Sequence, residues 1–442
     1  MVFGKLVLVL LLLHMSISKN YAQPVMPENP AANKQENKTF ATSNTSTKTS
    51  CDFGVIATAS AKTVEVKGES LHLSLEKPDS YVSGSKLREI QTLGPGNGIT
   101  ATGAIDPNSV IVRYKGIVLQ RGKDYLLDAN WGVLGIGPES CVTAADVVEV
   151  DYRYSLRRID SYVVDTNGAK VVVQGISDLT VPQPPAIADG QLRLANIFVD
   201  YFNDGKTAEF FPITETHITT QTTSGRIPKI LAKLQAGEQV RIVCWGDSVT
   251  EGGDASTPEK CYSAVFERML KEKFPKANIV VNVVAVGGSG SPQWLYPDKF
   301  KAPAGRSQDC LWEKVVQSKP DLVTVEFVND AGRAVPELHS IYSDILNRIN
   351  AANAEVIFIS PHFTLPSWMG FKGLKENENR PYVKMLKQFA DAEKVAFADA
   401  STRWENLHKE GIPYITLLKN GVNHPDDRGH MFFAEELIKC FE

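Results

Sequence analysis

Apolar and polar positions alternate along the first half of the chain. Between residues 51 and 218, short segments of period two are separated by Gly, Pro and Asp. This pattern predicts β-strands, because successive side chains of a strand point to opposite faces of the sheet. The predicted strands are residues 63–66, 71–75, 110–114, 147–154 and 170–173. No helical pattern interrupts them, so we expect an all-β, sandwich-like accessory domain over residues 51–218.

The pattern changes after residue 219. Near-continuous apolar runs occupy residues 241–245, 279–285, 322–327, 355–359 and 395–398, as in parallel strands that are buried on both faces. Segments with apolar residues at helical spacing separate these runs, among them residues 262–270 and 338–346. Alternating strands and helices predict a three-layer α/β domain over residues 219–442, with its ligand site at the carboxyl ends of the strands.

The first fifty residues resemble an export signal followed by a linker. Lys5 precedes an apolar run over residues 6–13, and Ala22 is a candidate cleavage point, so we expect a signal peptide at residues 1–22. The run is too short to span a membrane; an uncleaved anchor is the alternative. Residues 23–50 are rich in Pro, Asn, Thr, Ser and Lys, which predicts a disordered linker. The expected location is therefore extracellular or periplasmic.

Charge and cysteine content limit the other partners. The 442 residues include 47 basic and 51 acidic side chains, for a net charge of -4, too balanced for a nucleic-acid-binding surface. Six cysteines in a secreted chain permit disulfides, although their pairing cannot be read from the sequence. Cys244, within an apolar strand, is instead a candidate buried thiol. No cysteine has the CxxC spacing of a metal site, and we expect neither a metal nor an organic cofactor.

A serine follows the first apolar run of the α/β region. In Gly246-Asp247-Ser248 it stands at the carboxyl edge of the predicted sheet, where a nucleophile could be exposed and activated. A Gly-Asp-Ser turn alone could equally cap a helix. The longer run GDSVTEG at residues 246–252 resembles the first sequence block of the SGNH (GDSL-like) hydrolases, which have a flavodoxin-like three-layer fold.

Three further segments resemble the later blocks of that family, in the same order. Residues 285–289 resemble the block whose glycine offers a backbone N–H to an oxyanion, with Gly288 the best-aligned position. Residues 328–330 resemble the Gly-x-Asn-Asp block, which makes Asn329 a side-chain donor. Residues 423–430 resemble the last block, in which the first histidine, His424, is the base. The resemblance therefore implies Ser248 as nucleophile, His424 as general base, and an oxyanion hole of Ser248, Gly288 and Asn329.

The sequence departs from the family pattern at two positions. Phe327 stands where the third block has glycine, and Gly421 stands three residues before His424, where the family has its acid. Either another acid orients His424, with Asp426 and Asp427 the nearest candidates in sequence, or a backbone carbonyl does so and the enzyme is a dyad. Of the remaining histidines, we interpret His430 as structural and His362 as a pocket residue without an assigned role.

Together these features predict a secreted serine esterase that hydrolyses O-acyl esters, with O-acetyl groups on a carbohydrate as the expected substrate and the β domain assisting binding. A lipase or acyltransferase of the same family would use the same residues. A non-catalytic glycan-binding surface protein with a decayed hydrolase domain is the alternative from another class. We expect no nucleic-acid partner and no integral membrane span after signal cleavage.

Overall fold

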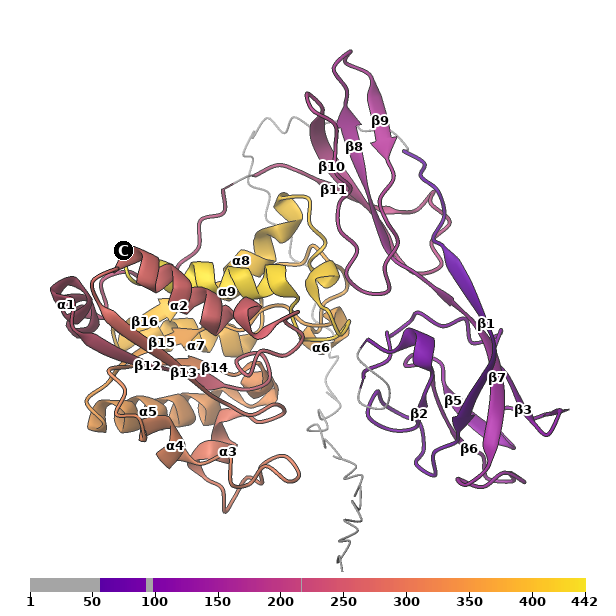
Figure 1. The fold of residues 1–442 in the computed structure, drawn as a ribbon, viewed down its shortest axis with the longest axis horizontal. Helices are drawn as coiled ribbons and strands as arrows, with labels where there is room; N and C mark the ends of the chain where they lie inside the picture. Colours follow the sequence, from indigo (N-terminus) through magenta and orange to yellow (C-terminus); the bar gives the residue numbers. More distant parts are fainter. Residues whose placement is uncertain (1–55, 93–97, 216) are drawn as a thin grey trace, which may run out of the picture.

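The computed structural model describes residues 56–92, 98–215 and 217–442. The predicted signal peptide and linker lie outside these residues. In Figure 1 the described chain forms three groups of elements: two antiparallel β units and a C-terminal α/β domain. Within the described residues, none of the helices combines the length and the apolar character that crossing a membrane requires.

The first β module comprises residues 63–155 and contains two antiparallel sheets. One sheet has the order β1-β7-β3-β4 and the other the order β2-β6-β5. The strands are β1 (Thr63–His72), β2 (Ser85–Lys86), β3 (Ile111–Tyr114), β4 (Ile117–Val118), β5 (Tyr125–Asp128), β6 (Val133–Ile136) and β7 (Val147–Ser155). A short 3-10 helix, η1 (Arg88–Ile90), follows β2. Buried side chains from both sheets, including Leu134 and Val150, form one apolar core.

A separate antiparallel sheet has the order β11-β10-β8-β9. Its strands are β8 (Arg158–Val164), β9 (Lys170–Val173), β10 (Leu192–Val199) and β11 (Glu209–Pro212). Phe198 and Phe211 of this second β sheet belong to one apolar cluster with Trp404 and Tyr414 of the α/β domain. The β-rich character predicted for residues 51–218 is confirmed, but the strands form two units instead of one sandwich-like body. Period two locates strands and cannot tell which partner covers their apolar face.

The α/β domain is built on a five-stranded parallel sheet of order β13-β12-β14-β15-β16. The strands are β12 (Gln239–Gly246), β13 (Asn278–Ala285), β14 (Leu322–Glu326), β15 (Glu355–Ile359) and β16 (Ala396–Ala398). Counted within the domain this is the order 2-1-3-4-5 of the flavodoxin-like fold. The predicted three-layer parallel domain is therefore confirmed.

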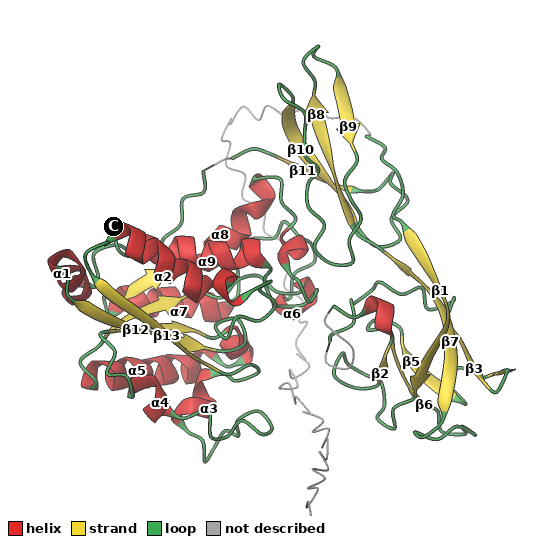
Figure 2. Cartoon of the chain, in the orientation of Figure 1, coloured by secondary structure: helices red, strands yellow, loops and turns green. Residues whose placement is uncertain are grey.

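Helices cover both faces of this sheet (Figure 2). One face packs against α1 (Pro228–Ala236), α2 (Tyr262–Lys273) and α9 (Asp427–Lys439). The other packs against α3 (Ser291–Leu295), α4 (Trp312–Val316), α5 (Val335–Ala351) and α7 (Pro381–Ala392). The remaining helical segments are η2 (Pro258–Lys260), η3 (Val328–Gly332), α6 (Pro366–Met369), α8 (Ala400–Glu405), η4 (Asn406–Lys409) and η5 (Tyr414–Leu417).

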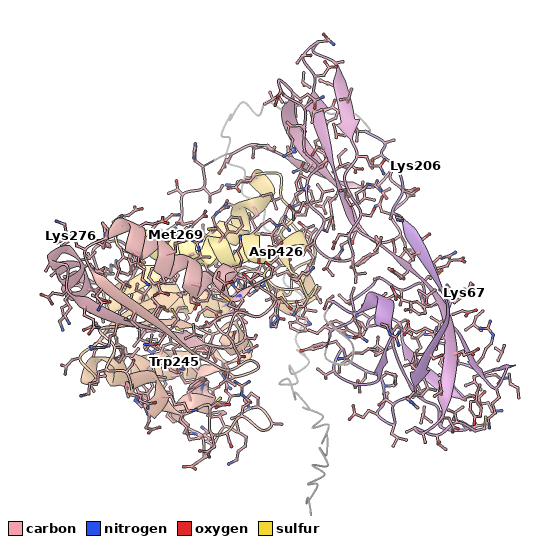
Figure 3. The ribbon with its side chains drawn as sticks, viewed as in Figure 1. Lys67, Lys206, Trp245, Met269, Lys276 and Asp426 are labelled. Carbon is pink, nitrogen blue, oxygen red and sulfur yellow. The ribbon has the colours of Figure 1, made fainter. Side chains whose placement is uncertain are left out.

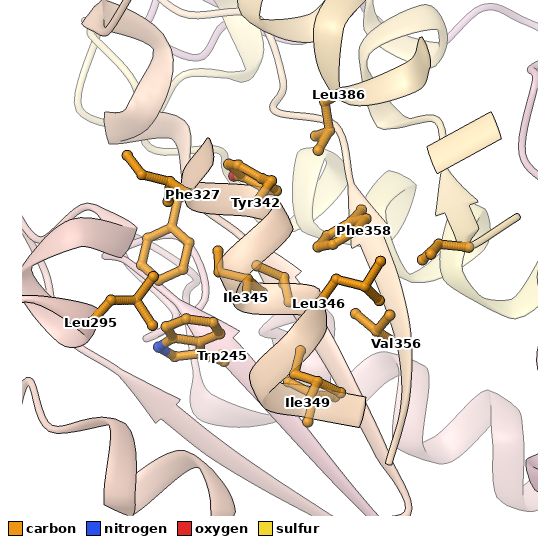
Figure 4. Packing of buried hydrophobic residues seen from close by; sticks show 14 of the residues in the cluster. Trp245, Leu295, Phe327, Tyr342, Ile345, Leu346, Ile349, Val356, Phe358 and Leu386 are labelled. Atoms are coloured by element: carbon orange, nitrogen blue, oxygen red, sulfur yellow. The ribbon is translucent and has the colours of Figure 1, made fainter. Parts of the chain in front are cut away.

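Phe327, at the position where the family has glycine, is a core residue. Its ring lies edge-on to Trp245, with ring centroids 5.1 Å apart, and both side chains are fully buried. Figure 4 shows the two rings beside the apolar side chains of α5. The backbone of Phe327 is extended, with φ -140°, a conformation open to any residue. The large side chain is therefore accommodated without strain.

The cysteines of the described residues are free thiols: Cys141, Cys244, Cys261, Cys310 and Cys440. Cys51 lies outside the described residues. The disulfides that the even number of cysteines permits are thus not formed among these five. Cys244 is fully buried in the apolar layer of α1, α2 and α9, as expected for a structural thiol.

Candidate active site

Ser248 lies two residues beyond the end of β12, in a tight turn. The turn is closed by hydrogen bonds from Glu251 N–H to Asp247 O, at 2.9 Å, and from Gly253 N–H to Ser248 O, at 2.7 Å. The buried carboxylate of Asp247 accepts the N–H groups of Val249 and Asn329, each at 3.1 Å. Asp247 therefore joins the serine turn to the loop after β14. Ser248 itself is half-buried.

His424 lies beside Ser248 although 176 residues separate them in the sequence. The His424 Nε2 is 2.9 Å from Ser248 Oγ, and its Nδ1 is 2.8 Å from Asp254 Oδ2. An ionised carboxylate can only accept, so Nδ1 carries the proton and Nε2 accepts from the serine hydroxyl. The His424 side chain is 20% exposed, and that of Asp254 is 3% exposed. An imidazole held in this way can remove the serine proton.

The carboxylate at His424 is not one of the two that the sequence suggested. Asp426, labelled in Figure 3, lies at the start of α9. It caps this helix by accepting the N–H groups of Arg428 and Gly429, and it also accepts from the Arg428 side chain. Asp427 accepts from Ser256 N–H at 2.8 Å and from Ser256 Oγ at 2.7 Å. Asp254 occupies the place that Asp426 and Asp427 were expected to fill. The partner of His424 Nδ1 is thus a carboxylate and not a backbone carbonyl, so the arrangement is a triad and not a dyad.

Gly421, at the position of the family's acid, has φ +74°, a left-handed conformation that favours glycine. Asp254 also has a left-handed backbone, with φ +62°, which Asp tolerates better than most residues. The chain approaches His424 closely there, since a Cβ on Gly253 would stand 3.0 Å from His424 Nδ1. The run Gly252-Gly253-Asp254 after the serine was the only sequence signal for this acid. Sequence position alone does not identify such an acid, because triads are recognised by geometry.

Three groups are the candidate oxyanion donors that the sequence predicted. The N–H groups of Ser248 and Gly288 donate to no other atom of the described residues. Gly287 lies against the serine, with a hypothetical Cβ 3.4 Å from Ser248 Cβ, but its N–H donates to Glu251 Oε2 at 2.7 Å. Asn329 Nδ2 donates one hydrogen to Ser289 O at 3.1 Å and retains a second. The structure thus leaves hydrogens on Ser248, Gly288 and Asn329 for a ligand.

Buried carboxyls lie beneath the serine turn. Glu326, at the end of β14, is fully buried and accepts from Thr250 Oγ at 3.0 Å. Burial, followed by the nearby charge of Asp247, raises the pKa of Glu326 well above its ordinary value. Burial also raises the pKa of Asp247 and raises that of Asp330 to about 6. Protonation of Glu326 would limit the negative charge behind a site where an oxyanion forms.

Two further histidines form hydrogen bonds with the backbone next to the triad residues. His362 Nε2 is 2.6 Å from Asn423 O, and His430 Nε2 is 3.1 Å from Gly253 O. Since carbonyl oxygens only accept, both Nε2 atoms carry hydrogen. His430 therefore has the structural place expected for it, and His362 contacts the residue before His424. No group of three or more His, Cys, Asp or Glu side chains within the described ranges could hold a metal ion.

The fold and the site define an α/β domain of hydrolase type, and comparison with known proteins identifies its family. Residues 244–432 match the model of the GDSL-like Lipase/Acylhydrolase family. The C-terminal domain is therefore a GDSL-like lipase/acylhydrolase domain. Residues 98–239 match the Domain of unknown function (DUF4815). No curated protein matches the chain.

Several solved structures are similar to part of the chain. A two-domain esterase (CEX) active on acetylated mannans, co-crystallized with mannopentaose, is 22% identical over 50% of this chain and 54% of its own, with a TM-score of 0.39. Axe2, an acetylxylan esterase from Geobacillus stearothermophilus, is 20% identical over 46% of this chain and 94% of its own, with a TM-score of 0.35. The match thus spans about half the length of the two-domain esterase.

Proposed function

We propose that this protein is a serine esterase with Ser248 as nucleophile, His424 as general base and Asp254 as the acid that orients the imidazole. The observation that carries the proposal is the chain of two hydrogen bonds, 2.9 Å from Ser248 to His424 and 2.8 Å from His424 to Asp254. This is the arrangement that activates a serine hydroxyl. The family match supports the class of reaction.

In the proposed reaction, His424 Nε2 takes the hydroxyl proton while Ser248 Oγ attacks the ester carbonyl carbon. The charge that develops on the carbonyl oxygen is met by the N–H groups of Ser248 and Gly288 and by the Asn329 amide. Each such donor typically lowers the barrier by about 3 kcal/mol. His424 then gives its proton to the departing alcohol, which leaves an acyl-Ser248 ester. Water, deprotonated by His424, hydrolyses that ester and restores the hydroxyl.

We further propose that the protein is secreted and acts on O-acyl, chiefly O-acetyl, esters of a carbohydrate. An export-type N-terminus and an attached β region favour a polymeric extracellular substrate. In the described α/β domain the large hydrophobic side chains that stand exposed are Val280, Val283 and Trp368. They belong to β13 and α6, and they do not form the extended apolar surface that a long acyl chain would need. Hydrolysis of long-chain lipid esters is therefore the less favoured function. Transfer of the acyl group to a second sugar would use the same three residues.

Labelling with a fluorophosphonate probe tests the nucleophile. The folded full-length protein should form an adduct at Ser248, Ser248→Ala should not, and Ser340→Ala, at an exposed serine of α5, should label as the wild type does. Absence of an adduct on folded wild-type protein would favour the non-catalytic glycan-binding alternative. Acetate release from acetylated xylan or mannan, compared with hydrolysis of nitrophenyl palmitate, tests the substrate. Activity on the long chain alone would overturn the carbohydrate proposal.

A further inference from the structure

The segment that carries His424 lies where the α/β domain meets the β region. We call residues 418–425 the base loop; a bridge between Leu418 and Pro425 closes it. Inside the loop, the buried Asn420 Oδ1 accepts the N–H groups of Val422, Asn423 and His424 at 2.9, 2.9 and 3.0 Å. The loop contains no helix or strand of its own, so its shape depends on this side chain and on its neighbours.

The α/β domain holds the inner side of the base loop. The His362 Nε2–H donates to Asn423 O at 2.6 Å, and the Leu365 N–H donates to Val422 O at 2.7 Å. Both donors belong to the segment that follows β15. Two successive carbonyl groups of the loop are therefore anchored by the hydrolase domain itself.

The β region holds the outer side. Thr180, in the segment between β9 and β10, donates from its Oγ to Lys419 O at 2.8 Å. Its methyl group would lie 3.3 Å from a Cβ on Gly421. Thr180 is itself fixed, because Asp178 Oδ1 accepts the N–H groups of Thr180 and Val181, each at 2.9 Å. A buried side chain of the β region thus closes against the position where the family has its acid.

An apolar contact accompanies this hydrogen bond. Val422 is fully buried and belongs to a cluster with Tyr81, Trp131 and Val133 of the first β module. Val422 is the only fully buried member of that described cluster that comes from the α/β domain. Two residues later the chain reaches His424, whose ring must keep two hydrogen bonds of 2.8 and 2.9 Å. A displacement of about 1 Å at a catalytic group can cost about a hundredfold in rate.

We propose that the β region is a positioning component of the active site: Thr180 and the Tyr81–Trp131–Val133 socket hold the base loop so that His424 meets Ser248 and Asp254. The proposal rests on the esterase function above. It assigns to Thr180 and Val422 a role in turnover itself, distinct from any help that the β region gives to substrate binding. Neither residue touches the reacting atoms, so both are positioning residues.

The test uses the full-length protein and 4-nitrophenyl acetate, a substrate too small to need an accessory binding domain. Thr180→Val keeps the shape and removes the donor. Its kcat per folded molecule should fall about tenfold, as expected for one lost hydrogen bond, while KM stays within about twofold, as for a change that spares ground-state binding. Thr180→Ser should restore most of the loss. Val422→Ala should lower kcat by a similar factor without a matching rise in KM.

Thr214→Val is the matched control. The Thr214 hydroxyl also contacts a carbonyl across the same boundary, Lys409 O at 3.4 Å, but that carbonyl lies outside the base loop. Its kcat should equal that of the wild type. Circular dichroism gives the folded fraction of every variant, so a loss of stability is separated from a loss of turnover. Wild-type kcat in both Thr180→Val and Val422→Ala would overturn the inference. Wild-type protein no more active than Ser248→Ala would instead overturn the esterase function.

Discussion

The two loops that complete the candidate triad are held in different ways. The base loop lies between the α/β domain and the β region and is in contact with both, and its Val422 is fully buried. The acid loop, residues 251–257, is fixed within the α/β domain: Asp427 of α9 accepts two hydrogen bonds from Ser256, and His430 donates to Gly253 O. Among the described residues, the contacts that hold the Asp254 loop come from the hydrolase domain, whereas those that hold His424 come from both parts of the molecule.

The two loops nevertheless have one kind of hydrogen bond in common. Each has a carbonyl, Gly253 O or Asn423 O, that accepts from the Nε2–H of a buried histidine. Burial lowers the pKa of His430 to about 4 and that of His362 to about 3. Both rings are neutral at ordinary pH as a result. The difference between the loops thus lies in their outer contacts, and the shared histidines offer a common reference for comparing them.

The largest effect is expected at the carboxylate that links the two loops. Asp254→Asn removes the charge opposite His424 Nδ1 and offers an amide that can hold the wrong imidazole tautomer. We expect kcat for 4-nitrophenyl acetate to fall by about 10⁴, as for a triad that depends on its carboxylate. Steady-state kinetics on the purified variant measure the change.

Asp426→Asn is the control, since Asn also caps helices well and Asp426 contacts Arg428 in place of His424. Its kcat should stay within about tenfold of the wild type, because Asn keeps the helix cap and the triad stays intact. An Asp254→Asn variant with near-normal kcat would mean that another group orients the imidazole. The hydrogen bond between Asp254 and His424 would then not be what links the two loops in the working enzyme.

The second prediction concerns how the free energy of unfolding changes with pH. The unfolded chain protonates each histidine near its ordinary pKa of 6.5, whereas the folded protein keeps His362 and His430 neutral down to about 3 and 4. Their contribution to the free energy of unfolding is therefore complete above pH 6.5 and is lost as the pH falls toward those lower values. Between pH 7 and pH 5 we expect a loss of about 2 kcal/mol for each histidine, measured by urea denaturation.

His362→Gln and His430→Gln should each remove one such increment from the pH dependence, whatever their stability at pH 7. His339→Gln, at an exposed position on α5, is the control that separates loss of a buried ring from loss of any histidine. Equal slopes for the wild type and both buried-histidine variants would show that these rings titrate alike in the folded and unfolded states. A buried, neutral histidine at each loop would then not be a feature that the two loops share.

The sequence was informative where a residue's role follows from its own neighbours in the chain. Buried parallel strands read as apolar runs, so the order and layers of the α/β domain could be predicted. Ser248, Gly288, Asn329 and His424 follow strand ends or stand in the last loop, and the structure brings Ser248 and His424 within hydrogen-bond distance.

What the sequence could not provide are contacts between distant segments. Asp254 reaches His424 only because a glycine pair and a left-handed backbone turn the chain toward it. The face of the second β sheet that holds Phe198 and Phe211 meets aromatic residues about two hundred positions away. In both cases the local pattern is that of an ordinary turn or strand, and the partner is set by the tertiary fold.

The third prediction addresses the interior of the base loop. Asn420→Ala removes the oxygen that accepts three successive N–H groups, and a buried donor left without a partner costs about 1–3 kcal/mol. We expect kcat to fall about a hundredfold, as for a shift of about 1 Å in a catalytic group. Asn420→Asp keeps the accepting oxygen but loses the hydrogen bond from Asn420 Nδ2 to Asn423 Oδ1, so it should retain more activity than Asn420→Ala. Equal losses in the two variants would show that the oxygen does not shape the loop.

The smallest effect is expected in the acid loop, because its anchor is redundant. Asp427→Asn weakens the contacts to Ser256, but the His430 hydrogen bond to Gly253 O remains. Burial raises the pKa of Asp427, and the two bonds from Ser256 outweigh it, so the net pKa is lowered and the carboxylate is ionised at neutral pH. We expect kcat to fall by about threefold, less than the net value of one hydrogen bond to a charged group. A loss larger than that of Thr180→Val in the same assay would reverse the comparison, because the acid loop would then be the more weakly supported of the two.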